Sequence, residues 1–287
     1  MSAKIIDGKL LSAKVKDELK VKVDTFFNKY NRQVCLAVIL VGNDPASEVY
    51  VRNKIKGCEY TGIKSLSFNL PVNSTEEQVS EVINTLATDD KVDGILVQLP
   101  LPKGLDESKI LSLIPAEKDV DGFLAENVGK LTLGEETTIA CTPHGVMKMF
   151  EEYNVDLCGK NVVVIGRSNI VGKPMALLLL QKNATVTVCH SKTQNIKDVC
   201  ASADVLVAAV GRPEFVKEDM VKEGAVVIDV GINRVDGKLK GDVAFNEVSK
   251  KASLITPVPG GVGPMTIAML LENTYLCAIR RENAKIW

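Results

Sequence analysis

The amino-acid sequence predicts an α/β protein of two domains, each built on a parallel β-sheet. Its 287 residues suggest two domains at roughly 150 residues each. Short apolar runs alternate with helical stretches along the whole chain, as expected when parallel strands are covered on both faces. The alternation starts afresh after Cys141-Thr142-Pro143, so we put the domain boundary there.

Helices and strands alternate in the first half of the sequence. Residues 8–30 carry apolar side chains at helical spacing, and residues 34–41 form the apolar run of a buried strand. Pro45 opens a second helix, which ends before Gly62. The other expected elements are a strand at 63–70, a helix to about residue 87 capped by Ser74 or Thr75, a strand at 92–99 and a helix at about 106–113.

The second half repeats the alternation. We expect strands at 161–166, 185–189, 205–210, 225–230 and 254–255, helices at 170–181 and about 265–281, and a hairpin turn at Asp236-Gly237. Residues 1–140 therefore form one domain, completed by the C-terminal helix at about 270–287. Residues 141–269 form the other domain.

The charge balance argues against a nucleic-acid partner. Lys and Arg number 35 and Asp and Glu number 36, which gives a net charge of −1 and no basic field for a phosphate backbone. Continuous apolar runs such as 37–41 are far shorter than the ~18 residues of a membrane span, and the N-terminus lacks the apolar core of a signal peptide. We therefore expect a cytoplasmic protein without nucleic-acid or membrane partners.

The cysteines and histidines indicate no metal site. The seven cysteines are widely spread and form no Cys-x-x-Cys pair, which favours free thiols in a reducing compartment. The two histidines, His144 and His190, belong to no His-Glu-x-x-His motif.

A glycine-containing turn in the second half predicts a nucleotide site. A strand at 162–165 runs into Gly166, and Gly172 follows before an apolar helix. Such a turn lets main-chain N–H groups and the helix dipole face a pyrophosphate, as in Rossmann-type domains. The glycine spacing differs from Gly-x-Gly-x-x-Gly, so a tight turn without a ligand is the alternative.

The end of the next strand favours NADP over NAD. An NAD site expects an acidic residue there, whereas this sequence reads Cys189-His190-Ser191-Lys192-Thr193. Arg167, Ser191 and Lys192 are suited to neutralise a 2′-phosphate. A solvated loop residue is the simpler interpretation of Lys192 alone.

Three segments of the first half carry polar residues at the ends of predicted elements. Tyr50 and Lys54 lie four residues apart on the second helix and so share a face. Gln98 ends an apolar strand, and Asp121 lies in an Asp-Gly turn. Ligands bind at such ends of βα units. A solvated lysine, a locally bonded glutamine and an ordinary loop are the alternatives. The Tyr-x-x-x-Lys pair of short-chain dehydrogenases is excluded, because in that family the glycine loop comes first.

Six segments together resemble one family. They are Tyr50-Val-x-x-Lys54-x-Lys56-x-Cys58, Gly94-Ile-Leu-Val-Gln98-Leu-Pro-Leu-Pro102, Lys118-Asp-Val-Asp121-Gly-Phe123, Gly166-Arg-Ser-x-Ile-Val-Gly172-x-Pro174, His190-Ser191-Lys-Thr193 and Thr256-Pro-Val-Pro-Gly-Gly-Val-Gly-Pro264. Over residues 3–281 the chain resembles the bifunctional methylenetetrahydrofolate dehydrogenase/methenyltetrahydrofolate cyclohydrolases. His144 departs from the pattern, since relatives often carry Arg or Lys there.

The resemblance implies a cleft between a substrate domain and a Rossmann-type NADP-binding domain. It implies that Lys54 is the catalytic residue of the cyclohydrolase and that a hydrogen bond with Gln98 sets its position. Tyr50 would stack on the folate ring system, and Asp121 would hold the amino group and ring nitrogens of the pterin. These four residues form the expected catalytic site.

The resemblance also implies the binding residues. The folate site comprises Tyr50, Val51, Arg52, Asn53, Lys54, Val97, Gln98, Leu99, Asp121, Pro259, Gly260, Gly261, Val262 and Gly263. The NADP site comprises Gly166, Arg167, Ser168, Ile170, Ser191 and Ile232. The implied reactions are NADP-dependent oxidation of 5,10-methylenetetrahydrofolate to 5,10-methenyltetrahydrofolate and hydrolysis of that product to 10-formyltetrahydrofolate. They belong to one-carbon metabolism and purine biosynthesis, and the family suggests a homodimer.

The chemistry of these reactions fits the residues. Loss of hydride from a methylene bridge between two nitrogens leaves a resonance-stabilised cation, so this step needs positioning but no general base. Hydrolysis of the methenyl carbon requires proton transfers, for which Lys54 must be partly neutral. Burial beside the cationic substrate would lower the pKa of Lys54.

Two other functions remain open from the sequence. One is a different two-domain dehydrogenase, such as a shikimate-dehydrogenase-like enzyme, which assays with shikimate and methylenetetrahydrofolate separate. The other is a catalytically inactive NADP-binding regulator, which a turnover assay tests.

Overall fold

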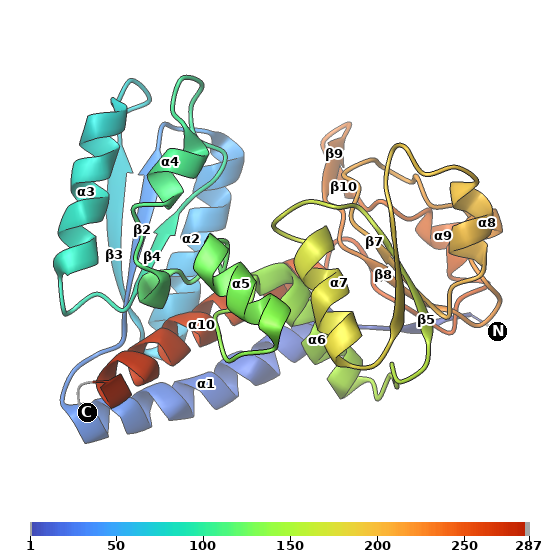
Figure 1. Ribbon diagram of the computed structural model, residues 1–287, viewed down its shortest axis with the longest axis horizontal. Helices are drawn as coiled ribbons and strands as arrows, with labels where there is room; N and C mark the ends of the chain where they lie inside the picture. Colours follow the sequence, from blue (N-terminus) through green and yellow to red (C-terminus); the bar gives the residue numbers. More distant parts are fainter. Residues whose placement is uncertain (1, 285–287) are drawn as a thin grey trace. The chain divides into compact units, whose positions relative to one another are not determined.

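The computed structural model describes residues 2–284, and the chain divides into two compact units (Figure 1). Unit 1 comprises the chain up to Ser12, Leu131–Glu135 and Ala140–Thr266. Unit 2 comprises Ala13–Lys130, Glu136–Ile139 and the chain from Ile267. Residues 285–287, the end of the expected C-terminal helix, lie outside the described residues.

Unit 2 is built on a three-stranded parallel sheet. Its strands are β2 (Cys35–Val41), β3 (Lys64–Leu70) and β4 (Gly94–Val97), in the order β3-β2-β4. The central strand β2 is buried along its whole length, as its continuous apolar run predicts. Strand β4 is shorter than the expected 92–99, because the prolines that follow have no N–H group with which to continue the ladder.

Helix α2 (Pro45–Thr61) begins and ends where its sequence predicts. A side-chain oxygen of Asp44 accepts a hydrogen bond from the N–H of Ser47 at 2.8 Å, which caps the first turn. Gly62 ends the helix with a φ of 79°, a conformation that glycine adopts without strain.

The other helices of unit 2 show which capping residue the chain uses. Helix α3 (Glu76–Thr88) starts at Thr75, which forms a capping box with Gln78, so Thr75 rather than Ser74 is the cap.

The further helical segments are α1 (Gly8–Tyr30), α4 (Glu107–Leu111), η1 (Ala116–Lys118), α5 (Ala125–Leu133) and α10 (Val262–Ala284).

Different helices cover the two faces of this sheet. Alternate residues of β2, including Ala37 and Ile39, pack in one hydrophobic cluster with Ile83 of α3. On the opposite face Gly94 of β4 lies against α10, since a Cβ at this glycine would be 3.4 Å from the methyl carbon of Thr274. The covered parallel sheet expected from the apolar runs is therefore present.

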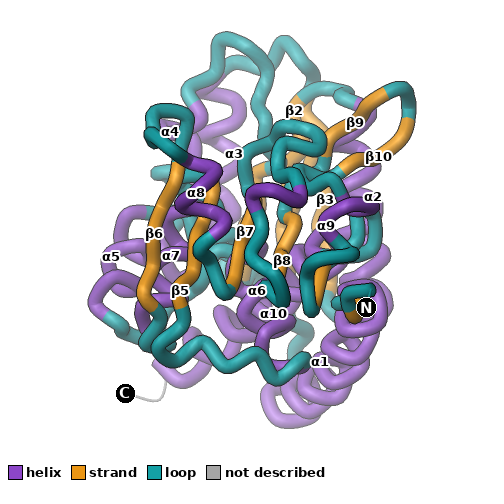
Figure 2. Tube along the Cα trace, turned by 90° about the vertical axis from the view of Figure 1, so that its right-hand side faces the viewer, coloured by secondary structure: helices purple, strands orange, loops and turns teal. Residues whose placement is uncertain are grey.

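Unit 1 is built on a six-stranded parallel sheet in the order β1-β11-β8-β7-β5-β6. Figure 2 shows β6, β5, β7 and β8 side by side in this sequence. The strands are β1 (Lys4–Ile5), β5 (Asn161–Ile165), β6 (Thr185–Cys189), β7 (Val205–Ala208), β8 (Val226–Asp229) and β11 (Leu254–Ile255). The other elements are α6 (Cys141–Glu152), α7 (Gly172–Gln181), α8 (Ile196–Ala201), η2 (Glu218–Met220), α9 (Phe245–Val248) and the hairpin of β9 (Asn233–Val235) and β10 (Lys238–Lys240).

The first residues of the chain belong to unit 1, whereas the sequence assigned residues 1–140 to the other domain. Strand β1 pairs with β11, and the N–H of Ile6 donates to the carbonyl of Ile255 at 2.8 Å. Ala3 is part of the hydrophobic core of unit 1. A two-residue strand leaves no periodicity in a sequence, so only its pairing reveals where it belongs.

The strand order of unit 1 reverses at β5, which has β6 on one side and β7 on the other. Open α/β sheets bind ligands at the carboxyl ends of strands at such a switch point. Gly166 follows β5 with a φ of 123°, and a Cβ there would lie 2.2 Å from the carbonyl oxygen of Ala209 in the loop after β7. The Rossmann-type sheet predicted from the glycine turn is confirmed.

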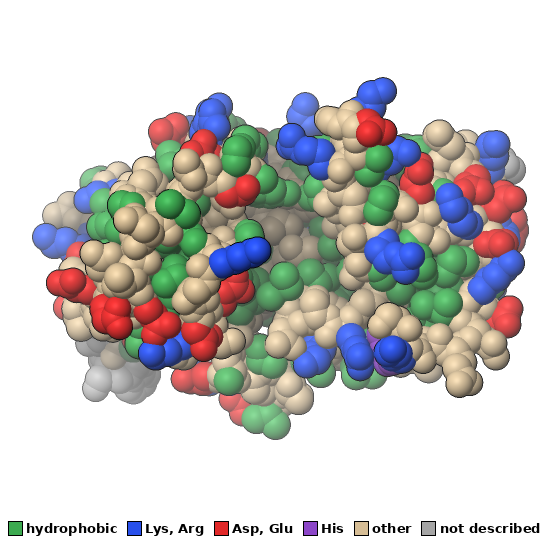
Figure 3. All heavy atoms as spheres, turned by 90° about the horizontal axis from the view of Figure 1, so that it is seen from above, with side chains coloured by type: hydrophobic (Ala, Val, Ile, Leu, Met, Phe, Trp, Pro, Cys, Tyr) green, Lys and Arg blue, Asp and Glu red, His purple; other side chains and the backbone are tan. Residues whose placement is uncertain are grey.

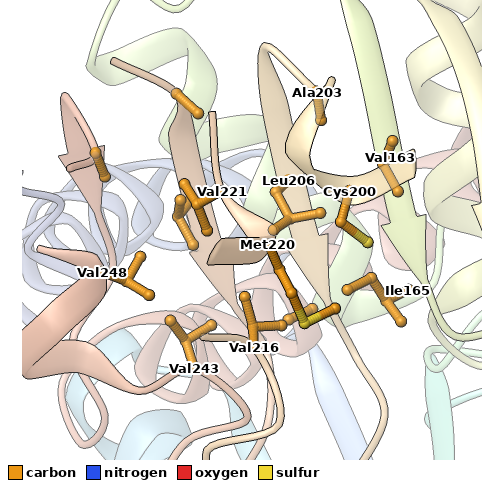
Figure 4. Packing of buried hydrophobic residues seen from close by; sticks show 14 of the residues in the cluster. Val163, Ile165, Cys200, Ala203, Leu206, Val216, Met220, Val221, Val243 and Val248 are labelled. Atoms are coloured by element: carbon orange, nitrogen blue, oxygen red, sulfur yellow. The ribbon is translucent and has the colours of Figure 1, made fainter. Parts of the chain in front are cut away.

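The core beneath this sheet is filled by small and branched side chains. Figure 4 shows Met220 of η2 among three other buried side chains. These are Leu206 of β7, Ile165 of β5 and Val216 from the loop before η2. All four are at most 7% exposed. Through Val216 and Met220, the segment between β7 and β8 packs against the strands of the sheet.

Helix α10 is long and apolar enough to cross a membrane by length and composition, and 56% of its most apolar window is buried in the structure. The core helix of a globular protein passes the same test. Polar residues such as Asn273 and Thr274 interrupt the apolar residues of this helix, so no uninterrupted apolar run of that length marks it in the sequence. On the face seen in Figure 3, Lys and Arg side chains are interspersed with Asp and Glu, in line with the balanced net charge.

A buried carboxylate holds the end of α10 to the sheet of unit 2. Asp93, just before β4, is 0% exposed and accepts hydrogen bonds from Arg32 at 2.8 and 2.9 Å, from Arg281 at 3.0 Å and from the N–H of Cys35 at 3.0 Å. Arg281 also pairs with Asp90, whose side chain is 91% exposed. The same arginine therefore has one buried and one solvated carboxylate partner.

We expect Asp93→Ala to lower the free energy of unfolding by about 3 kcal/mol, because it leaves two partly buried guanidinium groups without their shared carboxylate. Urea unfolding followed by circular dichroism measures this effect. Asp90→Ala is the matched control, and we expect a change within about 0.5 kcal/mol, since exposed ion pairs contribute little. Equal losses of unfolding free energy in the two variants would show that burial of the carboxylate does not determine how much it stabilises the protein.

Candidate active site

The predicted pair Lys54 and Gln98 is in direct contact in unit 2. Lys54 Nζ donates a hydrogen bond to Gln98 Oε1 at 3.0 Å. Gln98 Nε2 donates to the carbonyl of Leu99 at 2.6 Å. The glutamine is therefore bonded both to the local backbone and to the lysine, and the backbone bond sets which end of its amide faces Lys54.

Two elements bring this pair together. Lys54 lies on α2, and Gln98 follows the last residue of β4, with its N–H donating to the carbonyl of Ile39 at 2.8 Å. Lys54 is half-buried, and Tyr50, one turn earlier on α2, is 39% exposed. A partly exposed aromatic ring beside a half-buried lysine leaves both accessible to a ligand.

The segment that carries Asp121 runs alongside β4. Asp119 forms a parallel bridge with Ile95, so the chain that follows heads towards the same carboxyl end of the sheet as Gln98. Lys118, which is 2% exposed, anchors the start of this segment by donating to the carbonyls of Leu86, Ala87 and Asp89 at the end of α3.

Asp119 shapes the turn on which Asp121 lies. Its carboxylate accepts hydrogen bonds from the N–H groups of Gly122 and Leu124, each at 3.0 Å, and from Asn127 Nδ2 at 2.8 Å. From the other side, Asn273 Nδ2 on α10 donates to the carbonyl of Val120 at 2.9 Å. The residues on either side of Asp121 are thus held by hydrogen bonds from within the turn and from α10.

Asp121 and Lys54 are close enough to influence each other electrostatically. Burial raises the pKa of Asp121 to about 6, and the positive charge of Lys54 acts in the opposite direction. A carboxyl group with this pKa is mainly ionised at neutral pH and becomes protonated in mildly acidic solution.

The other predicted folate residues of unit 2 differ from one another in how far their side chains are buried. The side chains of Val51 and Val97 are buried in the core, at 6% and 1% exposure. Arg52 and Asn53 are exposed on α2. Arg52 and Asn53 are two and one positions from Lys54 along α2, so they point to other faces of the helix than Lys54 does.

Two glycines shape the predicted nucleotide turn of unit 1. A Cβ at Gly172 would lie 2.2 Å from the carbonyl oxygen of Gly166, so the start of α7 can approach the end of β5 only without a side chain there. Ser168 Oγ accepts hydrogen bonds from the N–H groups of Val171 and Gly172 at 3.1 and 3.3 Å. Ser168 therefore caps this turn itself, whereas the sequence predicted only ligand-facing N–H groups.

The other predicted NADP residues lie on loops at the carboxyl ends of the strands. Arg167 and Ser191 are exposed after β5 and β6, and Ile232 is 45% exposed after β8. Ile170, also 45% exposed, lies just before α7. The arrangement fits a dinucleotide with a 2′-phosphate, since the loop after β6 has a basic residue, Lys192, and no carboxylate.

The loop predicted to line the folate cleft belongs to unit 1. Gly260 has a φ of 103°, and its carbonyl accepts a hydrogen bond from the N–H of Lys9 at 3.0 Å. Val262 and Gly263 form the first turn of α10, where the sequence predicted a loop through Pro264, because glycine and proline are tolerated in a first turn. The expected cleft between the two domains stays a prediction.

Several residues that hold these loops were not predicted from the sequence. Asp119 and Lys118 belong to the segment Lys118–Phe123, but their roles depend on hydrogen bonds that only the structure shows. Asn273 is a buried amide in an apolar helix, and that contrast was a signal for a specific partner. Two further buried aspartates, Asp229 and Asp242, lie beside the loop of Ile232.

Comparison with known proteins identifies the family of both parts of the chain. The family model of the tetrahydrofolate dehydrogenase/cyclohydrolase catalytic domain matches residues 6–121. The model of the NAD(P)-binding domain of the same family matches residues 140–282.

Individual relatives are similar over nearly the whole chain. The bifunctional protein FolD of Acetivibrio thermocellus is 58% identical over 97% of this chain and 98% of its own length. The crystal structure of the bifunctional FolD methylenetetrahydrofolate dehydrogenase/cyclohydrolase of Campylobacter jejuni is 55% identical, with a TM-score of 0.95 over 98% of this chain and 100% of that one. The Trypanosoma brucei enzyme, complexed with NADP and an inhibitor, is 39% identical, with a TM-score of 0.94 over 99% of each chain. Matched along its length by both domain models and by these relatives, the chain belongs to the tetrahydrofolate dehydrogenase/cyclohydrolase family.

Proposed function

We propose that this protein performs both reactions of its family at one folate site in unit 2. It oxidises 5,10-methylenetetrahydrofolate with NADP and then hydrolyses 5,10-methenyltetrahydrofolate to 10-formyltetrahydrofolate. The observation that carries the proposal is the hydrogen bond from Lys54 to Gln98, formed next to the Asp121 carboxyl group. The inactive regulator is disfavoured, because this set of polar residues is complete.

In the oxidation the protein contributes mainly binding and orientation. Bound NADP supplies the hydride acceptor at C4 of its nicotinamide. Tyr50 stacks on the folate ring system, and Asp121 accepts hydrogen bonds from the amino group and ring nitrogen of the pterin. Because only hydride leaves the bridge carbon, no side chain has to remove a proton in this step.

In the hydrolysis Lys54 acts as the general base and then as the general acid. Its neutral amine accepts a proton as water adds to the methenyl carbon and returns it to the nitrogen that leaves the carbon. The remaining hydroxyl proton of the adduct is released to solvent as the C=O of the formyl group forms. Gln98 accepts one N–H of the amine and so helps to orient the amine in the site. The cationic substrate disfavours a second positive charge nearby, which favours the neutral form of Lys54.

The two units divide the ligands between them in this proposal. Unit 2 holds the pterin, and the further predicted folate residues, Pro259 to Gly263, belong to unit 1. Gly166, Arg167, Ser168, Ile170, Ser191 and Ile232 of unit 1 hold NADP. The domain boundary follows the two units, so the segment up to Ser12 belongs to the NADP half.

We also propose a cytoplasmic homodimer whose product supplies formyl-transfer reactions such as those of purine biosynthesis. Strand β6 is the last strand at one edge of the six-stranded sheet, and its residues Thr185, Thr187 and Val188 are exposed. An edge of this kind offers main-chain hydrogen bonds to a second copy. Sedimentation velocity of the purified protein tests the dimer.

Arg167→Ala should lower kcat/KM with NADP about tenfold or more and leave kcat/KM with NAD within about twofold. The reason is that a charge-assisted bond to the 2′-phosphate exists only with NADP. Steady-state dehydrogenase assays with both nucleotides measure the ratio. Equal losses with NAD and NADP would show that Arg167 does not recognise the phosphate.

Asp121→Ala should raise the folate KM of both activities about tenfold or more, because both reactions use the same bound pterin. Dehydrogenase and cyclohydrolase assays on one preparation make the comparison. A loss confined to one activity would instead give Asp121 a role in that step.

The raised pKa of Asp121 adds a pH test to the same site. Since burial raises this pKa to about 6, the carboxyl group becomes protonated and loses its acceptor as the pH falls through that value. The folate KM of the wild-type protein should therefore rise below about pH 6 in both assays. Asp121→Asn, which does not titrate, should have a flatter profile.

Lys54→Gln should abolish cyclohydrolase activity and retain measurable dehydrogenase activity, so that methenyltetrahydrofolate accumulates. An amide keeps a polar side chain of similar reach but cannot accept a proton at neutral pH. Lys56→Gln, an exposed position on the same helix, is the control and should keep both activities. If a folded Lys54→Gln protein hydrolysed its substrate at the wild-type rate, Lys54 would be an ordinary surface lysine.

A further inference from the structure

Asp242 is a buried carboxylate surrounded by N–H donors. It is 0% exposed, and its Oδ2 accepts from the N–H groups of Val210 and Gly211 at 2.7 and 2.9 Å. Its Oδ1 accepts from the N–H of Arg212 and from Asn233 Nδ2, each at 2.9 Å. Four N–H donors face this group, an environment that suits a side chain with two acceptor oxygens.

Asp229, at the end of β8, continues the same network. It is 3% exposed and accepts from the N–H groups of Gly231 at 3.0 Å, Asp242 at 2.9 Å and Val243 at 2.9 Å. Position 231 must be a glycine beside this network, since a Cβ at Gly231 would lie 2.2 Å from Asp242 Oδ1. Together they connect the loops after β7 and β8.

These loops lie where the proposed cofactor site needs them. Residues 209–212 follow β7 and residues 230–233 follow β8, at the carboxyl ends of neighbouring parallel strands. Ile232, a predicted NADP residue, is 45% exposed and lies between Gly231 and Asn233, which are both bonded to the aspartate pair. The pair therefore holds the main chain of the residue before Ile232 and the side chain of the residue after it.

The pair has the features of a positioning device rather than of a ligand site. Both side chains are almost fully buried, so neither reaches a bound nucleotide. Within residues 2–284 no Lys or Arg forms an ion pair with Asp229 or Asp242 and no cluster of metal-ligating residues occurs, so N–H groups alone satisfy the two carboxylates.

We propose that Asp242, supported by Asp229, is a positioning residue that sets the affinity for NADP by holding the loops after β7 and β8 in their binding conformation. This inference rests on the proposed function, which puts NADP at these loops. It adds residues that do not touch the cofactor and assigns them an effect on one of the two reactions only. The hydrolysis uses no NADP, so it reports separately on the fold and on the folate site.

Asp242→Asn tests the proposal with little change in size. An amide has one acceptor oxygen, and its NH₂ group must face N–H donors, so it breaks at least one side of the network. We expect the KM for NADP to rise about tenfold, as for the loss of hydrogen bonds to a charged group, while cyclohydrolase kcat/KM stays within about twofold. Asp236→Asn, at the exposed hairpin turn between β9 and β10, is the matched control and should leave both assays unchanged.

A second variant covers the case in which Asp242→Asn does not fold. Asn233→Ala removes one donor and leaves the carboxylate with three, so the KM for NADP should rise about threefold with normal hydrolysis. An unchanged KM for NADP in a folded Asp242→Asn protein, or in Asn233→Ala if the first is unfolded, would overturn the inference. A wild-type protein that fails to oxidise methylenetetrahydrofolate with NADP would instead refute the proposed function, which separates the two failures.

Discussion

Buried aspartates that accept hydrogen bonds from N–H groups hold the loops at the carboxyl ends of both sheets. In unit 2 the carboxylate of Asp119 fixes the turn that carries Asp121. In unit 1 Asp242 and Asp229 fix the loops after β7 and β8, the second of which carries Ile232. Loop backbone near a sheet must satisfy its N–H groups without a neighbouring strand, and a buried carboxylate satisfies several at once. The proposed substrate and cofactor residues depend on this constraint.

The same constraint explains how one protein supports two reactions with few catalytic groups. Hydride transfer requires that two ligands be held accurately, which rigid loops provide. Hydrolysis additionally requires a group that exchanges protons, and Lys54 is proposed for that role. Gln98 bonds both Lys54 and the carbonyl of Leu99, so the lysine is oriented by the end of β4 rather than by α2 alone. A long, flexible lysine side chain thereby has a defined direction.

Much of the fold could be predicted because its signals are local. The apolar run of β2, the helix start at Pro45 and the Asp-Gly turn of the hairpin each act within a few residues, and each occurs as expected. Helix α5 and the short helices α8 and α9 were not predicted, because brief helices carry little periodicity. Strand β1 was missed for a related reason: two residues become a strand only through their partner β11.

By itself the sequence determined the order of the longer strands and helices, the chemical types of Lys54, Gln98 and Asp121, and the absence of an acidic residue after β6. These properties follow from residue identity and spacing along the chain. Only the tertiary structure decided that Lys54 donates to Gln98, that Lys118 and Asn273 anchor the turn of Asp121, and that Asp242 connects two loops. Each of these contacts joins elements far apart in the sequence, and long-range pairing depends on how sheets and helices pack, which local spacing does not encode.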